Sequence, residues 1–62
     1  MDAYFCYIHR PTKPVADLRI LACDGDDELA ARLDEMAADY PAARIEVFRD
    51  ERLITVMPRP QA

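Results

Sequence analysis

Residues 26–40, DDELAARLDEMAADY, are the one segment of the sequence with a clear helical period. Its larger apolar side chains recur at intervals of i, i+4, i+7, i+8 and i+11, which gathers them into one stripe along an α-helix. That stripe consists of Leu29, Leu33, Met36, Ala37 and Tyr40. Most charged residues lie off the stripe, so the pattern predicts a helix with one buried face and one hydrated, acidic face.

Both ends of this helix are marked in the sequence. Asp24 and Asp26 are candidate N-caps, because a short carboxylate accepts hydrogen bonds from the first free backbone N–H groups. Asp27 and Glu28 suit the positive end of the helix dipole. Pro41 ends the helix, since proline disfavours the α conformation in the residue before it.

Length and charge restrict the class of protein. The 62 residues allow one small domain, which buries only about 60% of the surface of its unfolded chain, so self-association would add stability. Eight basic residues against twelve acidic ones count against nucleic-acid binding, which needs a basic patch. The sequence has neither a membrane span nor a signal peptide, so we expect a cytoplasmic protein that does not bind membranes.

Four segments rich in aromatic or β-branched residues are expected to form strands. They are residues 3–10, 17–23, 44–49 and 52–57. With the helix they predict an α+β domain of order ββαββ, in which one helix packs on one face of a four-stranded, mainly antiparallel sheet. The first strand is the most continuously apolar and is expected near the centre, in the order 2-1-3-4. Residues 58–62 form a short tail.

Alternation along each strand assigns side chains to the two sides of the sheet. Asp50-Glu51 is interpreted as a two-residue turn, although this pair is unfavoured in primed turns and a wider loop is the alternative. On this register the helix-facing side holds Tyr4, Cys6, Ile8, Leu18, Ile20, Ala22, Ile45, Val47, Ile54 and Val56. The outer side holds Phe5, Tyr7, Leu21, Cys23, Phe48, Leu53 and Met57, with His9, Arg19, Arg44, Glu46 and Thr55 among them. A slip of one residue in either hairpin would exchange the two sides.

Few residues offer a site for catalysis or metal binding. Cys6 and Cys23 are expected to be reduced, to point to opposite sides and to serve as small hydrophobic residues. With a single histidine, His9, the chain contains neither a redox motif nor the ligands of a zinc site. The acidic run 24–28 lacks the later glycine and glutamate of a calcium loop. We therefore expect no enzymatic activity, no cofactor and no metal.

Three groups of residues carry a resemblance to a known group of proteins. They are Tyr4-Phe5-Cys6-Tyr7, Ala22-Cys23-Asp24 before the acidic helix start, and Ile45-Glu46-Val47-Phe48 with Arg52-Leu53-Ile54. From about residue 3 to residue 54 the chain resembles a group of short bacterial proteins of unknown function with a Tyr-x-Cys-Tyr first strand. No activity and no site residues are established for that group, so the resemblance implies none.

The apolar outer side of the predicted sheet leads to the main functional hypothesis. One helix covers only one side of such a sheet, and a second apolar side of this kind is typical of a contact surface. We therefore expect a non-enzymatic protein–protein interaction module that forms a homodimer. The expected contact residues are Phe5, Tyr7, Leu21, Phe48 and Leu53.

Two alternatives remain open at this point. The first is a small-ligand-binding domain with a pocket at the dimer interface, in which His9, Arg19 and Arg44 supply polar contacts. The second is an acidic inhibitor that docks on a basic surface of another protein. Its contacts would come from the outward acids of the helix, Asp27, Asp34, Glu35 and Asp39.

Overall fold

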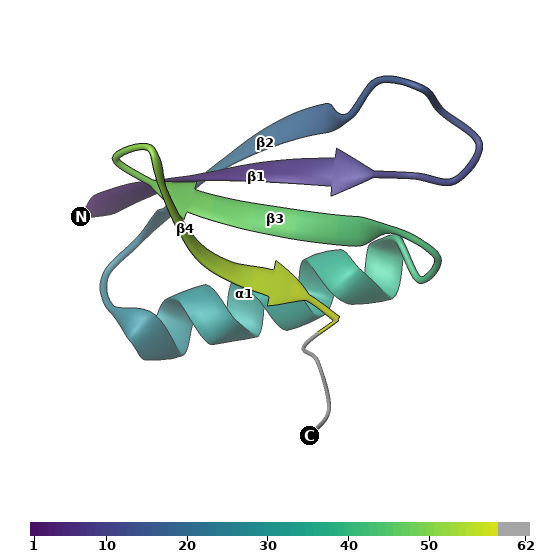
Figure 1. The fold of residues 1–62 in the computed structure, drawn as a ribbon. Coiled ribbons are helices and arrows are strands. Elements are labelled where there is room, and N and C mark those ends of the chain that lie inside the picture. The colour runs from purple at the N-terminus through teal and green to yellow at the C-terminus, as the bar shows by residue number, and fades with distance from the viewer. Residues whose placement is uncertain (59–62) are drawn as a thin grey trace.

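A four-stranded sheet lies above one helix in the computed structural model, which describes residues 1–58 (Figure 1). The elements are β1 (Asp2–His9), β2 (Asp17–Cys23), α1 (Asp26–Asp39), β3 (Arg44–Arg49) and β4 (Arg52–Met57). All neighbouring strands are antiparallel and their order is β2-β1-β3-β4. The predicted α+β class, the ββαββ order and the central first strand are confirmed. The predicted tail lies outside the described residues from position 59 onward.

The core lies between the sheet and α1. Strict alternation along the two central strands produces it, because every second residue of β1 and β3 points toward the helix. The buried residues of these strands are Tyr4, Cys6, Ile8, Ile45 and Val47. The helix contributes Leu29, Leu33 and Met36, three residues of the predicted stripe. The predicted helix-facing side is therefore correct for both central strands.

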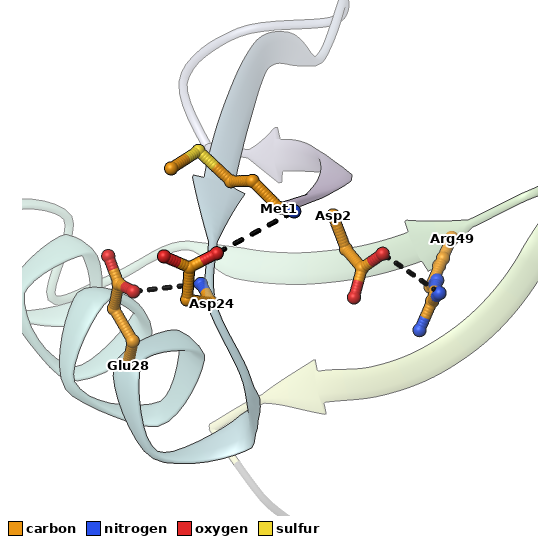
Figure 2. Close-up of polar contacts among 5 residues, drawn as sticks. All are labelled: Met1, Asp2, Asp24, Glu28 and Arg49. Carbon is orange, nitrogen blue, oxygen red and sulfur yellow. Dashed lines mark hydrogen bonds and ion pairs between the residues drawn. The ribbon is translucent and has the colours of Figure 1, made fainter.

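The start of α1 differs from the prediction. Gly25 is the N-cap, with φ 106°, and no side chain caps the helix. Neither Asp24 nor Asp26 is the cap, because the chain enters the helix through a backbone conformation that glycine adopts at little cost. Instead, the Glu28 carboxylate accepts a hydrogen bond from the backbone N–H of Asp24 at 2.8 Å (Figure 2). The Asp24 carboxylate lies 3.6 Å from the amino group of Met1.

The end of α1 follows the prediction. The backbone N–H of Tyr40 donates to the carbonyl of Met36 at 3.1 Å, and that of Ala43 donates to the carbonyl of Tyr40 at 3.1 Å. Pro41 is the second residue of the resulting turn, a position that suits its fixed φ. Pro41 therefore ends the helix and directs the chain into β3.

The long β1–β2 connection is tied to the end of the helix. Pro11 is the second residue of a turn in which the N–H of Lys13 donates to the carbonyl of Arg10 at 3.1 Å. The Arg10 guanidinium contacts the Asp17 carboxylate and lies 5.6 Å from the centre of the Tyr40 ring. This cation–π contact joins the loop to α1.

The register of β2 contradicts the predicted sides. Leu21 pairs with Tyr4 and Arg19 pairs with Cys6, so both face the helix. Leu18 and Ile20 pair with Tyr7 and Phe5 and therefore lie on the outer side, together with Ala22. The prediction was wrong for this strand because β2 has apolar residues at both parities, and a long loop does not impose a register. Leu21 packs against the core as a partly buried residue.

Cys23 also lies on the helix-facing side, because it pairs with Asp2 at the start of β1. The expectation that Cys6 and Cys23 point to opposite sides is therefore wrong. Both thiols are free and fully buried in the same core. The predicted role as small core hydrophobes agrees with this position.

The turn between β3 and β4 has two residues, as interpreted from the sequence. Asp50 and Glu51 adopt φ values of 50° and 64°, the sign that a type I′ turn requires at both central positions. This backbone is strained for residues with a side chain, which is why Asp-Glu is an uncommon pair there. The tight turn prevails because it matches the twist of the two strands.

A β-bulge changes the sides of β4 beyond this turn. Phe48 pairs with Leu53, but Val47 pairs with Thr55, so Ile54 is an extra residue. Ile54 is consequently exposed, and Val56 pairs with Glu46 on the outer side. Thr55 lies on the helix-facing side, and so does Met57, which is buried. The predicted sides of these four residues were wrong because a bulge inverts the alternation.

Among residues 1–58, no helix has the length and apolar character needed to cross a membrane.

Arg49 links the end of β3 to the start of β1, because its guanidinium donates to the Asp2 carboxylate at 3.0 Å (Figure 2). It also lies 5.9 Å from the centre of the Tyr4 ring. These contacts join the end of β3 to the start of β1.

Candidate functional site: the open face of the sheet

The open face is the side of the sheet opposite α1. Two rows of paired side chains cross all four strands from β2 to β4 on this face. The first row is Ile20, Phe5, Phe48 and Leu53, and the second is Leu18, Tyr7, Glu46 and Val56. Ile20 is 59% exposed and Leu18 52%, although both lie within regular strands. Apart from Glu46, every residue in the two rows is apolar or aromatic.

Three aromatic rings form the centre of the open face. Phe5 pairs with Phe48 across β1 and β3. The ring of Tyr7 meets that of Phe48 edge to face, with centroids 5.6 Å apart and an interplanar angle of 87°. This geometry is favourable between aromatic rings and restricts their rotamers. The centre of the face is therefore a preformed apolar surface.

A polar cluster borders the rings at the end of β1. His9 Nε2 lies 2.6 Å from Glu46 Oε1, and because an ionised carboxylate only accepts, the imidazole donates this hydrogen bond. Arg44 Nη1 lies 3.3 Å from Glu46 Oε2. Glu46 thus has two cationic or donor partners, one on each oxygen. The charges of this cluster are largely compensated within the face.

Sequence reasoning missed the carboxylate partner of His9. Glu46 is 37 residues away in the sequence and lies diagonal to His9 in the β1–β3 register, next to Arg44. The β1–β3 pairing is the signal that would have found it. Among residues 1–58, the hydrogen bond to Glu46 is the only one that the His9 side chain forms.

A groove of about 690 Å³ runs along β1 and β3 on the open face. Its apolar lining consists of Phe5, Tyr7 and Phe48. His9 and Glu46 border one end, and the β3–β4 turn borders the other with Asp50 and Glu51. The volume lies in the range of ligand pockets, about 300–1,000 Å³.

Four of the five predicted contact residues lie on the open face. They are Phe5, Tyr7, Phe48 and Leu53. The predicted position of Leu21 was wrong, because the register of β2 turns it toward the helix. Leu18 and Ile20 occupy the open face in its place. Whether these residues contact a partner stays a prediction.

The three residues predicted to supply polar contacts to a ligand do not lie on the same face of the sheet. His9 and Arg44 lie on the open face, but Arg19 lies on the helix-facing side, where the prediction did not place it. Arg19 of β2 and Arg32 of α1 line a small surface hollow. Glu35 and Asp39 of α1 line the same hollow. Two arginines therefore lie next to Glu35 and Asp39, two of the four helix acids from which the inhibitor hypothesis takes its contacts.

The two thiols have the properties of core residues. Burial raises the pKa of Cys6 above its ordinary value of 9.0, and the nearby Cys23 raises it further. The pKa of Cys23 is raised as well, chiefly by burial and then by the charge of Glu28. Protonated, inaccessible thiols are poor nucleophiles. Within residues 1–58, no group of three or more His, Cys, Asp or Glu side chains is placed to hold a metal ion.

Comparisons with protein-family models, with curated proteins and with solved structures found no match to this chain. The resemblance to a group of short bacterial proteins therefore stays a prediction.

Proposed function

We propose that the protein is a non-enzymatic interaction module that pairs with a second copy of itself through the open face. The observation that carries the proposal is the row of apolar side chains that crosses all four strands opposite the helix. Water contacts large parts of Ile20, Leu18 and Leu53, although each lies in a strand. An apolar surface as continuous as this one is typical of a contact site.

The dimensions of the sheet support a modest dimer. Four strands about 4.8 Å apart and six residues of about 3.3 Å each give a face of roughly 20 by 20 Å. A standard interface buries about 800 Å² per partner. A second copy would therefore need nearly the whole open face and its rim. We expect a dimer whose population depends on concentration.

The chemistry of the open face is compatible with its own copy. A two-fold interface brings the same patch of both chains together, so the patch must complement itself. Burying a lone charge would be costly, but Glu46 already has His9 and Arg44 as partners. Aromatic residues at the centre, here Phe5 and Phe48, are the side chains that usually contribute most of the affinity.

The proposal is tested by placing a carboxylate on the open face. Phe48→Asp and Leu53→Glu should each shift sedimentation velocity from dimer toward monomer, because an unpaired charge would be buried in the contact. Val15→Glu is the matched control, since Val15 is 75% exposed in the β1–β2 loop and lies outside the face. Far-UV circular dichroism reports whether each variant is folded.

Leu53→Glu keeps the test decisive if Phe48→Asp does not fold, because Leu53 is about half exposed at the edge of the sheet. A folded Leu53→Glu protein with an unchanged dimer fraction would contradict the proposal. So would an equal loss of the dimer in Val15→Glu.

A further inference from the structure

The two edge strands of the sheet, β2 and β4, differ in how readily another strand can join them (Figure 1). The edge at β4 is interrupted by the bulge at Ile54, and Pro58 follows the strand directly. β2 has neither feature, because its seven residues pair with β1 without a register shift. It also contains no lysine and no proline, the residues that commonly prevent pairing at an edge. The edge at β2 is therefore the one that favours pairing with a further strand.

The middle of β2 is uncovered on both sides of the sheet. Leu18 and Ile20 are exposed on the open face, and Arg19 between them is exposed on the helix-facing side. Every second backbone N–H and C=O of an edge strand points away from its neighbour. Among residues 1–58, no hydrogen bond joins the backbone of β2 to a loop, to the helix or to a side chain. The outward backbone groups of this strand are therefore free to pair.

We propose that β2 pairs antiparallel with the β2 of a second copy, about a two-fold axis at Ile20. Directly opposite residues of an antiparallel ladder have their side chains on the same side of the sheet, so the axis coincides with a residue. An axis at Ile20 pairs all seven residues of β2, a strand longer than the usual five or six. It places Leu18 opposite Ala22 of the second copy, so that the exposed apolar residues of the two strands meet.

Other registers of the same pairing are less favourable. An axis at Arg19 would place two guanidinium groups directly opposite each other, and like charges in that position are destabilising. An axis at Leu21 would shorten the ladder and place Leu18 opposite Asp24. With the axis at Ile20, no two charged side chains of β2 are directly opposite each other. The sequence of β2 is therefore complementary to itself in this register.

The edge pairing is separate from the contact through the open face. It joins the two sheets into one, with both helices on the same side, and leaves Phe5, Phe48 and Leu53 uncovered. The inference therefore goes beyond the proposed function and does not rest on it. Because the edge is held mainly by backbone hydrogen bonds, whose net contribution is modest, we expect it at higher concentration than the contact through the open face.

Amide hydrogen exchange of the ¹⁵N-labelled chain, followed by NMR at increasing protein concentration, tests the pairing. Every second amide of β2 should exchange at least about tenfold more slowly in concentrated than in dilute solution, because these N–H groups become hydrogen-bonded across the axis. The outward amides of β4 are the internal control and should keep their rates. A dimer formed through the open face alone leaves the amides of both edges accessible. Unchanged rates along β2 up to millimolar concentration would overturn the proposal.

Leu53→Glu distinguishes a failure of this inference from a failure of the proposed function. Leu53 lies on β4, at the opposite edge of the sheet, so the variant should lose the contact through the open face and keep the protection of β2. If β2 is never protected but Leu53→Glu lowers the solution mass, the edge proposal fails and the proposed function stands. If β2 is protected and Leu53→Glu leaves the mass unchanged, the proposed function fails and the edge proposal stands.

Cysteine substitutions in the Leu53→Glu background locate the axis. Ile20→Cys places two thiols directly opposite each other, with Cα atoms about 4.5–5.5 Å apart, a separation that a disulfide can span on mild oxidation. Arg19→Cys should form an intermolecular disulfide at least about tenfold more slowly, because Leu21 lies opposite it. The native Cys6 and Cys23 are buried and do not compete. An equal or faster reaction of Arg19→Cys would contradict an axis at Ile20.

Ile20→Glu tests the edge by charge. It places two carboxylates opposite each other at the axis, and because Ile20 also lies in the first row of the open face, it should oppose both contacts. Its β2 amides should keep the dilute-solution rates at every concentration. Val15→Glu, in the exposed loop before β2, is the matched control and should retain the protection. Protection that persists in a folded Ile20→Glu protein, or is lost equally in Val15→Glu, would overturn the assignment.

Discussion

The same four strands form two faces of the sheet. The helix α1 covers one of them, and no element among residues 1–58 covers the other. On the helix-facing side Cys6, Ile8 and Val47 are fully buried, and no polar or charged side chain among the described residues is buried with them. On the open face, the neighbouring residues Phe5 and Tyr7 of the same strand remain more than one third exposed. The alternation of β1 therefore places apolar side chains on both faces, while residues 1–58 provide one helix to cover them.

Folding removes apolar area from water on the helix-facing side, but leaves apolar area in contact with water on the open face. Apolar area contributes only when water is removed from it, about 25 cal/mol per Å². The helix-facing side has gained that contribution, and the open face gains it only from a partner. A domain of this size has little stability to spare, so covering the second face would have a large relative effect.

The strongest test of this comparison is one substitution made on each face. Ile8→Ala removes buried methyl groups from a side chain with no exposed surface and should lower the free energy of unfolding by about 2–5 kcal/mol. This loss approaches the whole stability of a small domain. Urea denaturation monitored by circular dichroism measures it.

Ile20→Ala is the control, because it makes the same chemical change on the open face. At concentrations where the chain is monomeric, it should cost less than about 0.5 kcal/mol. A loss as large as that of Ile8→Ala would mean that the open face is covered by the chain itself and would overturn the comparison.

The buried thiols give a second test, in alkaline solution. Because folding raises the pKa values of Cys6 and Cys23, the unfolded chain ionises first, and stability should fall as the pH rises above 9.0. Each thiol can contribute a slope of up to about 1.4 kcal/mol per pH unit. The Cys6→Ala, Cys23→Ala double variant should show a smaller slope. An unchanged slope would contradict the burial of both thiols on the helix-facing side.

The β3–β4 turn, which borders the groove, gives a smaller effect of opposite sign. Glu51 has φ 64°, so Glu51→Gly should relieve strain and raise the free energy of unfolding by roughly 0.5–1 kcal/mol. The same substitution in the helix, Glu35→Gly, should lower it by a similar amount because glycine is a poor helix former. Thermal and urea denaturation compare the two. Destabilisation by both would contradict the left-handed turn.

The polar cluster of the open face should have the smallest effect. Glu46→Gln weakens the contacts with His9 and Arg44, which are partly hydrated, so the expected loss is below about 1 kcal/mol in the monomeric Ile20→Glu background. Glu35→Gln on the helix surface is the control and should be close to neutral. A loss of several kcal/mol would show that the cluster is shielded from water, in conflict with an open face.

The helix and β3 could be predicted from their own patterns, and the sides of β1 follow from its pairing with β3, because β1 alone is apolar at both parities. Tyr4, Cys6 and Ile8 alternate strictly with outward residues, as do Ile45 and Val47, and the helical stripe has a single apolar face. Burial on one side then fixes the register. The same alternation correctly predicted that Phe5, Tyr7 and Phe48 lie on the open face.

The edge strands could not be predicted in the same way. In β2 both Ile20 and Leu21 are apolar, so neither parity is favoured, and the long loop before it leaves the register free. In β4 the bulge at Ile54 depends on how the strand twists after a tight turn, which no local pattern encodes. The open face therefore contains Leu18 and Ile20 where the sequence indicated Leu21.

The Glu46 cluster and the groove depend on contacts between residues distant in sequence. His9 and Glu46 are brought together only by the pairing of β1 with β3, and the turn acids reach the same groove through β3. Single-sequence patterns contain none of these distances. Once the strand order was known, the diagonal position of Glu46 would have been sufficient to place it beside His9.

The solution mass of the unmodified chain, measured by light scattering across a concentration series, tests the central claim most directly. An open apolar face that pairs with its own copy predicts a mass that rises from one chain toward two as concentration increases. It also predicts that Ile20→Glu stays at the mass of one chain over the same range. A mass of one chain at every concentration of the unmodified protein would contradict self-association through the open face.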